Sequence, residues 1–165
     1  MRKTSAVLGS AVFFVVAPVM VGFVVPWWIA GWRAGNTLWA VGGAFLILVG
    51  LVPLIESFAR FALVGLGTPA PVAPTKHLVV TGYYRYVRNP MYLGVLAIIV
   101  GNGLIIGNVA VFGYAALIAL GFAAFVLGYE EPTLRGQFGA EYEEFCGNVP
   151  RWIPRLTPWT GARKE

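Results

Sequence analysis

Two arginines stand three residues apart in the segment TGYYRYVRNPMYLG, residues 81–94. Arg85 and Arg88 precede the pair Asn89-Pro90, and a proline in the first helical turn after an asparagine cap is a common helix start. Because a helix N-terminus favours negative charge, two guanidinium groups beside it could grip a carboxylate or a phosphate. The alternative is that Asn89-Pro90 only starts a helix and the arginines contact lipid phosphates.

A second polar group is the adjacent pair Glu130-Glu131, which Pro132 follows. Two neighbouring carboxylates repel each other and resist burial at the end of an apolar run. Such a pair can bind hydroxyl or ammonium groups of a ligand, or accept a proton as a general base. The alternative is an interfacial stop signal, a role that Lys and Arg fill better than acids.

The single histidine and the single cysteine, His77 and Cys146, do not extend this chemistry. They cannot supply the usual ligand sets of a zinc or iron site, and a lone cysteine excludes an internal disulfide. We therefore expect no metal site and ordinary structural roles for both residues. The net charge of +5 and the pI near 9.7 indicate topology signals and lipid head-group contacts rather than nucleic-acid binding.

Long apolar runs must position these polar groups. Of the 165 residues, 58% are hydrophobic and 12% charged, against about 25% charged in a typical soluble domain, and the mean hydropathy is +0.75. We therefore predict an all-α membrane protein with about four transmembrane helices, since apolar helices of this length face lipid. The predicted spans are residues 5–28, 37–55, 91–106 and 109–128.

The connections between the runs predict how the polar groups meet. Gly107-Asn108 is a turn signal, so the last two spans are predicted to form a helical hairpin. A hairpin would make residues 85–92 and 129–131 neighbours in space. After the second run, Glu56 and Arg60 lie four residues apart, which is the spacing of an ion pair on one helical face.

The distribution of Lys and Arg predicts the orientation. Four spans would put both termini and residues 56–90 on one side, which then carries eleven of the twelve Lys and Arg residues, while the other side carries only Arg33. Because short cytoplasmic segments are enriched in Lys and Arg, we predict a protein of the cell (inner or plasma) membrane with both termini in the cytoplasm.

The chain from residue 129 onward alternates aromatic with charged residues. Phe138, Tyr142 and Phe145 have the spacing of one helical face, which predicts an amphipathic cytoplasmic helix, and VPRWIPRL predicts an extended strap after it. We expect one membrane domain with two N-terminal spans (1–67), a cytoplasmic loop (68–90), the hairpin (91–128) and a cytoplasmic tail (129–165).

The segments GYYRYVRNPMYLG and EEPTLRGQFGAEYEEFCGNVPRWIP resemble the isoprenylcysteine carboxyl methyltransferase and phospholipid methyltransferase superfamily of integral membrane enzymes. That family has a segment G-P-Y-R-Y-x-R-H/N-P-x-Y-x-G, a helical hairpin, the pair E-E, then F-G-x-x-Y-x-x-[YF] and V-x-R-[FWI]-I-P. The similarity covers about the last ninety residues, in order. It implies an S-adenosylmethionine-dependent methyltransferase without a Rossmann domain, whose tail caps the cofactor and whose helices leave a tunnel toward lipid.

By position, the resemblance also implies the site and its partners. Arg85 or Arg88 would grip a carboxylate, and Glu130 or Glu131 would hold the ribose or the ammonium group and could act as the base. The product would be S-adenosylhomocysteine, and the partners would be membrane lipids and a lipophilic acceptor, with no obligate protein partner. The implied cofactor-site residues are Tyr84, Arg85, Arg88, Asn89, Pro90, Tyr92, Glu130, Glu131, Tyr142, Arg151 and Ile153.

Two positions depart from the family pattern. Tyr83 stands where proline is usual, and Asn89 stands where the prenylcysteine enzymes have histidine, which weakens prenylcysteine as the acceptor. Two other functions stay open on the sequence. One is an NADPH-dependent membrane reductase with a related hairpin, and the other is a four-span transporter, although no glutamate lies inside a predicted span to couple protons.

Overall fold

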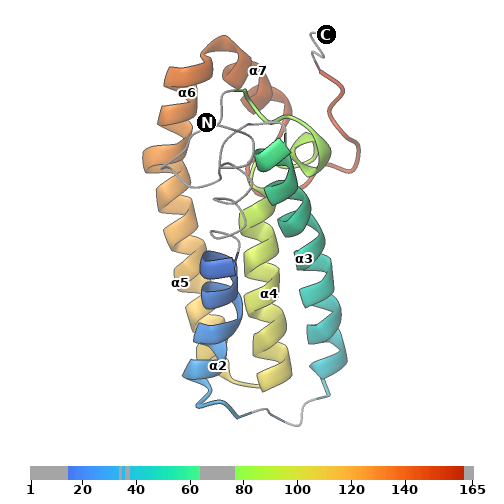
Figure 1. The fold of residues 1–165 in the computed structure, drawn as a ribbon, viewed down its shortest axis with the longest axis vertical. Coiled ribbons are helices and arrows are strands. Elements are labelled where there is room, and N and C mark those ends of the chain that lie inside the picture. The colour runs from blue at the N-terminus through green and yellow to red at the C-terminus, as the bar shows by residue number, and fades with distance from the viewer. Residues whose placement is uncertain (1–14, 34, 36–37, 64–76, 162–165) are drawn as a thin grey trace.

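The computed structural model describes residues 15–33, 35, 38–63 and 77–161, and the regular elements within these ranges are helical. Figure 1 shows α3, α4 and α5 side by side along the long axis, with α6, α7 and the C-terminal segment at one end. The all-helical prediction is therefore confirmed over the described residues. The elements are η1 (Val15–Val24, a π-helix), α2 (Val25–Ile29), α3 (Ala40–Leu63), η2 (Gly82–Arg85, a 3₁₀ turn), α4 (Pro90–Ile106), α5 (Val109–Phe125), η3 (Val126–Glu130, a π turn), α6 (Glu131–Phe138) and α7 (Ala140–Asn148).

Helix α4 lies at the centre of the bundle, in contact with α3, α5, η1 and α2. Its side chains Ile98 and Ile99 are fully buried in one cluster with Leu54 of α3 and Val111 of α5. A helix that is apolar on every side must be enclosed by protein or lipid. Here protein covers most of it, since ten of its 17 residues are buried, and α3 and α5 pack against it.

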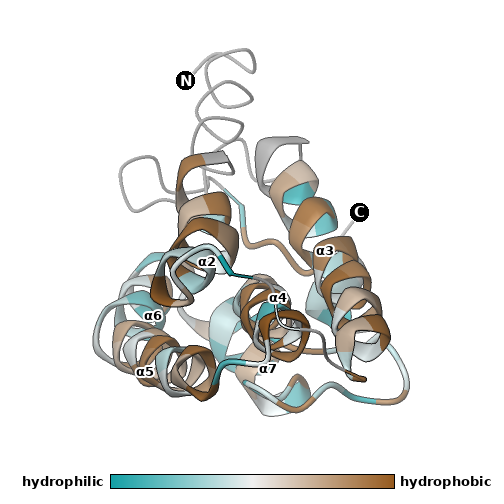
Figure 2. Ribbon diagram, turned by 90° about the horizontal axis from the view of Figure 1, so that it is seen from below, coloured by the Kyte–Doolittle hydropathy of each residue, from teal (hydrophilic) through white to brown (hydrophobic). Residues whose placement is uncertain are grey.

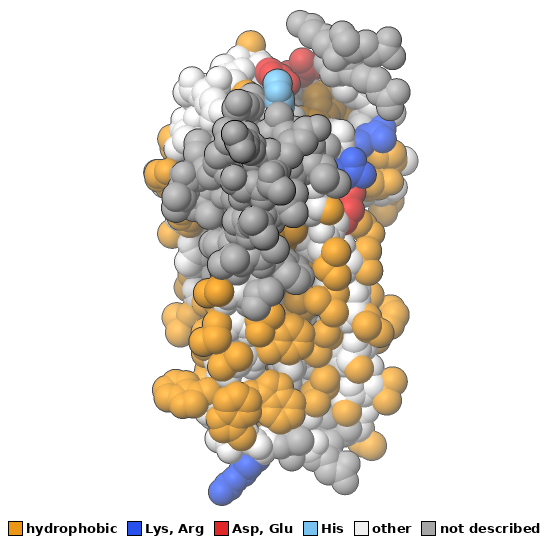
Figure 3. Space-filling view, viewed as in Figure 1, with side chains coloured by type: hydrophobic (Ala, Val, Ile, Leu, Met, Phe, Trp, Pro, Cys, Tyr) orange, Lys and Arg blue, Asp and Glu red, His pale blue; other side chains and the backbone are white. Residues whose placement is uncertain are grey.

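The outward faces of α3 and α5 are apolar. Leu48 and Leu117 are among the exposed large side chains, and Figure 2 shows much of the ribbon of both helices in the brown of hydrophobic residues. The apolar stretches Ala40–Arg60 and Val109–Phe138, of 21 and 30 residues, are long enough to cross a bilayer, and Val16–Ile29 and Pro90–Ile106 are shorter apolar helices. Charged side chains gather toward the upper end of the face in Figure 3, with further basic atoms at the lower tip. This arrangement is typical of a membrane protein.

Four glycines bring α3 and α4 into backbone contact. Gly50 faces Gly94, and Gly43 faces Gly101, so the pairs repeat every seven residues along both helices. A methyl group added at Gly94 would lie 2.6 Å from the carbonyl oxygen of Gly50. Small residues let membrane helices approach this closely. The contact fixes the height of α3 relative to α4, and with it the height of Glu56.

A buried polar cluster attaches the N-terminal helix to the hairpin. Asn102 of α4 donates to the carbonyl of Gly22 (2.9 Å) and accepts from the indole N–H of Trp27 (3.0 Å). The hydroxyl of Tyr114 in α5 donates to the carbonyl of Val21 at 3.1 Å. Pro26 lies four residues after Gly22 and five after Val21. It has no N–H to donate to either carbonyl, so side chains of the hairpin supply these hydrogen bonds.

Most predicted apolar runs lie in helices, but their ends differ. The described part of the first run starts at Val15, and residues 5–14 lie outside the described ranges. Helix α3 begins at Ala40 rather than 37 and continues past residue 55 to Leu63, because Leu54 and Phe58 both pack into the core. Residues 64–76 of the predicted loop are likewise outside the described ranges.

The hairpin has the predicted turn and a longer second arm. Gly107 takes a left-handed conformation (φ 70°) at the end of α4, and the side chain of Asn108 accepts from the amide of Ala110 at 2.9 Å. The predicted end of the last span at residue 128 is wrong as a helix end, since η3 and α6 follow α5 without a break to Phe138. The prediction of one tail helix is also wrong, because Gly139 (φ 51°) separates α6 from α7.

Candidate functional site

A short segment directly before α4 forms a wall between two cavities. It comprises residues 82–90, which include the turn η2 and end where Pro90 starts α4. Gly82 opens it with φ 61°, a conformation that suits glycine, and a side chain here would collide with Glu56. The side chains of this wall segment divide between the two cavities.

The smaller cavity has a volume of about 70 Å³ and lies at the junction of the wall segment, η3 and α7. Apolar side chains such as Val126 and Phe145 form part of its lining. Six residues that the resemblance places in the cofactor site line it as well: Tyr84, Arg88, Asn89, Glu130, Glu131 and Tyr142.

Glu131 is the centre of an ion-pair cluster beside this cavity. Its side chain is 3% exposed, and its carboxylate accepts from Arg88 at 3.1 Å, from Arg135 at 3.3 Å, and from Arg151 at 2.5 and 3.0 Å. The three arginines come from the wall segment, α6 and the C-terminal segment. The hydrogen bond to Glu131 raises the pKa of Arg151 above its ordinary value. Glu131 therefore joins three separate parts of the chain.

Glu130 has a different environment although it is adjacent to Glu131. Its carboxylate accepts a hydrogen bond from the hydroxyl of Tyr92 at 2.8 Å. The π turn η3 ends at Glu130, and such a turn shifts the helical register, so neighbouring residues can serve different partners. Arg88 with Glu131 and Tyr92 with Glu130 make the two segments spatial neighbours, as the hairpin predicts.

The small cavity is lined by buried tyrosines and by an arginine with one unpaired hydrogen-bond donor. The Nε of Arg88 is buried without a hydrogen-bond partner, while its NH1 group contacts Glu131 and the sulfur of Cys146, the latter at 2.8 Å. Burial raises the pKa of the phenols of Tyr84 and Tyr142, which keeps both neutral. The cavity thus offers a free cationic N–H, a carboxylate and neutral phenols.

The C-terminal segment, residues 150–160, lies along the wall segment and is called the strap below. The amide of Arg88 donates to the carbonyl of Pro150, that of Arg155 to Tyr86, and that of Trp159 to Arg85, each at 2.9 Å. Asn89 stands at the start of α4, but its side chain donates to the carbonyl of Arg151 (3.1 Å) instead of capping the helix. These contacts hold the strap and the wall segment as one unit.

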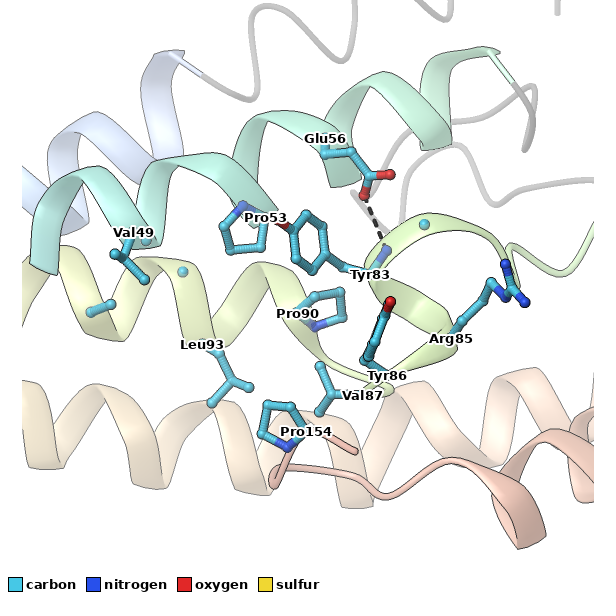
Figure 4. Close-up of a pocket in the computed structure, with 14 residues that line it drawn as sticks. Val49, Pro53, Glu56, Tyr83, Arg85, Tyr86, Val87, Pro90, Leu93 and Pro154 are labelled. Carbon is cyan, nitrogen blue, oxygen red and sulfur yellow. Dashed lines mark hydrogen bonds between the residues drawn. The ribbon is translucent and has the colours of Figure 1, made fainter. Parts of the chain in front are cut away.

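The larger cavity is a groove of about 650 Å³ between α3, the start of α4 and the wall segment. Figure 4 shows Val49, Pro53, Leu93 and Pro154 around it, with Glu56 hydrogen-bonded to the amide of Tyr83. The groove is apolar along α3 and α4 and polar near the wall segment. Its lining comprises Val49, Gly50, Pro53, Glu56, Gly82, Tyr83, Arg85, Tyr86, Val87, Pro90, Leu93, Gly94, Ala97 and Pro154.

The two arginines of the predicted anion grip face different cavities. Arg85 lines the groove and donates to the carbonyl of Trp159 at 2.7 Å, while Arg88 lines the small cavity. Pro90 also lines the groove. Ile153 belongs to the lining of neither cavity and is 79% exposed. The structure therefore brings most, but not all, of the predicted site residues together.

Sequence reasoning missed the groove residues Glu56 and Pro154. Glu56 does form the expected pair with Arg60, at 2.6 Å, but it also contacts the amide of Tyr83, 27 residues away. The spacing of Glu56 and Arg60 predicts only an ion pair on one helix. No local sequence pattern indicates that Glu56 also contacts the wall segment. Within the described ranges, no group of three or more His, Cys, Asp or Glu side chains could hold a metal ion.

Comparisons with known proteins show which family the sequence resembles. The sequence profile described as "Phospholipid methyltransferase" matches residues 16–141. A curated protein of Schizosaccharomyces pombe (strain 972 / ATCC 24843), named "Protein-S-isoprenylcysteine O-methyltransferase", is 35% identical over 81 residues, which are 48% of this chain and 34% of that protein. The chain thus matches about a third of this relative's length. No solved structure matches the chain.

Proposed function

The chain belongs to the phospholipid methyltransferase family, and on that premise we propose that it transfers a methyl group from S-adenosylmethionine to a lipophilic acceptor at the membrane, with S-adenosylhomocysteine as product. The matched residues 16–141 include both the wall segment and the pair Glu130-Glu131. Family membership favours methyl transfer over the reductase and the transporter, which the sequence alone left open.

One observation carries this proposal: Arg88, whose buried Nε has no hydrogen-bond partner, lines the same small cavity as Glu130. S-adenosylmethionine has a free amino acid end with a carboxylate and an ammonium group, and it supplies an activated methyl group on a sulfonium. In our proposal Arg88 binds the carboxylate and Glu130 binds the ammonium. The small cavity of about 70 Å³ admits only this polar end, since pockets for whole cofactors and drug-sized ligands measure about 300–1,000 Å³.

Glu131 has another role in this proposal. Its carboxylate is occupied by three arginines and 3% exposed, so it positions Arg88 and the strap rather than contacting a ligand. Tyr92 fixes the carboxylate of Glu130 through their hydrogen bond. The chemistry assigned to the glutamate pair thus falls to Glu130, with Glu131 as its support.

We assign the acceptor to the groove. Its volume of about 650 Å³ lies within the range of pockets for whole organic ligands. Val49, Leu93 and Ala97 offer an apolar wall for a hydrocarbon chain, while Glu56 and Arg85 lie at the polar end for a head group. A donor that is already activated needs mainly positioning and exclusion of water, which walls of this kind supply.

The site is proposed to face the cytoplasm. Arg60, Arg85, Arg88 and Arg155 lie at the site end of the bundle, and Arg33 lies in the opposite connection. Lys and Arg accumulate on the cytoplasmic side of membrane proteins. Both termini and the cofactor-binding end would then lie on the cytoplasmic side of the cell membrane, where S-adenosylmethionine is made.

Calorimetry on the purified protein in detergent tests the function. We expect micromolar binding of S-adenosylhomocysteine, about −8 kcal/mol, and no binding of NADPH. Glu130→Gln removes one charged hydrogen bond and should weaken that binding about 10- to 100-fold, while the exposed Glu141→Gln serves as the control. NADPH binding alone would establish the reductase instead. Binding that is equal in Glu130→Gln and Glu141→Gln would overturn the assignment of Glu130.

A further inference from the structure

Two large apolar side chains project from the strap without any covering protein. Ile153 is 79% and Leu156 is 99% exposed, and Pro154 between them is exposed as well. Single exposed apolar residues are common on protein surfaces. These three are close together on a segment that backbone hydrogen bonds to Arg85, Tyr86 and Arg88 hold in place. Their outward direction is therefore fixed.

The strap lies beside the first turns of α4 and not beyond the end of the bundle. Pro154 shares the lining of the groove with Leu93 of α4. The ring of Trp152 lies 6.5 Å from that of Tyr92, in the first turn of α4. Side chains at this height lie at the bilayer interface if α4 crosses the membrane.

Exposed apolar side chains lie on both sides of the groove. Val52 and Ile55 of α3 are half-exposed, and Pro53 of the same helix lies opposite Pro154 across the groove (Figure 4). The apolar patch of the strap thus lies across the groove from the helix α3. A bilayer can cover apolar surface on both sides of a groove at once.

The charges of the strap also fit a lipid surface. Residues 149–161 contain Arg151, which pairs with Glu131, and Arg155, and they contain no acidic residue. Arg155 follows Pro154 directly, and its NH1 group donates to the carbonyl of Asn148 at 2.6 Å, so no carboxylate neutralises it in the contacts described. Basic residues next to inserted apolar side chains are typical of segments that bind anionic membrane surfaces.

We propose that Ile153, Pro154 and Leu156 insert into the bilayer interface and hold the strap against the membrane at the mouth of the groove. The partner is an anionic lipid surface. This contact does not depend on the methyl-transfer chemistry. It assigns Ile153, which the resemblance placed at the cofactor, to lipid.

Spin-label accessibility tests the contact directly. Labels would be placed at Leu156→Cys, Val52→Cys and Glu144→Cys in a Cys146→Ser background, with the protein in vesicles of phosphatidylcholine and phosphatidylglycerol. Val52 on α3 represents lipid, and exposed Glu144 on α7 represents water. We expect the label at residue 156 to lose collisions with a water-soluble nickel complex and to gain collisions with oxygen, as at residue 52. Collision rates equal to those at residue 144 would overturn the proposal.

Hydrogen exchange gives a second measurement that needs no label. The double variant Ile153→Glu/Leu156→Glu should lose protection at the amides of Arg155 and Trp159, which donate to the wall segment. The matched control Thr157→Glu/Thr160→Glu adds the same charge at exposed polar positions of the strap. We expect faster exchange in the first variant only, in vesicles. Equal exchange in both variants would mean that lipid does not hold the strap.

Discussion

Neutralising Glu131 should destabilise the protein more than any other single loss of charge at the site. The substitution Glu131→Gln keeps the size of the side chain but leaves three arginines without their shared carboxylate. Their exposures decide the magnitude: the Arg88 side chain is 10% exposed, whereas those of Arg151 and Arg135 are 32% and 44% exposed. The two outer arginines stay solvated and add little.

The buried pair with Arg88 therefore sets the expected effect. Removing one partner of a buried ion pair costs about 3–5 kcal/mol, because the remaining charge is left uncompensated. Denaturant unfolding in detergent micelles, followed by circular dichroism, should show a loss of this size. Glu143→Gln is the matched control, since Glu143 is 57% exposed and pairs only with Arg135 in the contacts described. Equal unfolding free energies for the two variants would refute the role of Glu131 as a buried hub.

Three further perturbations concern the rest of the fold. Gly94→Ala places a methyl group 2.6 Å from the carbonyl of Gly50 and should cost about 1–3 kcal/mol in unfolding free energy, while Gly121→Ala, with open space around it, should cost nothing. Asn102→Leu leaves the indole N–H of Trp27 unpaired and should lower the unfolding free energy by about 1–3 kcal/mol. In a double-mutant cycle, Asn102→Leu should cost less when Trp27→Phe has already removed the indole N–H. Burial raises the pKa of Tyr142, so its contribution to stability is complete below about pH 10 and is lost as pH rises above that value. Tyr142→Phe should therefore weaken the alkaline loss of stability, and an unchanged slope above pH 10 would contradict this.

The apolar runs and the hairpin could be predicted because local signals determine them. Gly107-Asn108 ends one helix and caps the next without help from distant residues. The end of the second hairpin arm could not be predicted in this way. In the sequence, the charge of Glu131 ends the apolar run and so predicts the end of the helix. In the structure the helix continues, because Arg88 and Arg151, 43 and 20 residues away, pair with the carboxylate of Glu131. A sequence pattern shows the charge but not its partners.

The candidate site was partly predictable for a similar reason. The neighbourhood of Arg88 and Glu131 follows from the hairpin, since its two ends must meet. The direction of each side chain depends instead on the 3₁₀ turn Gly82–Arg85 and on the strap. Arg85 consequently faces the groove, although its spacing from Arg88 indicates a shared grip. Ile153 points outward because the backbone of the strap, rather than its side chains, contacts the wall segment.

The wall segment lies between the two cavities, so the two proposed ligands would lie on opposite sides of it. A methyl group passes only between atoms in contact. With the cofactor's polar end at Arg88 and the acceptor in the groove, the residues between them, Val87 to Pro90, must yield or the ligands must meet around their edge. The carbonyls of the strap accept hydrogen bonds from this stretch, from the amide of Arg88 and from the side chain of Asn89. If the stretch yields, these hydrogen bonds to the strap must break, so a strap held against the membrane would link that step to the lipid surface.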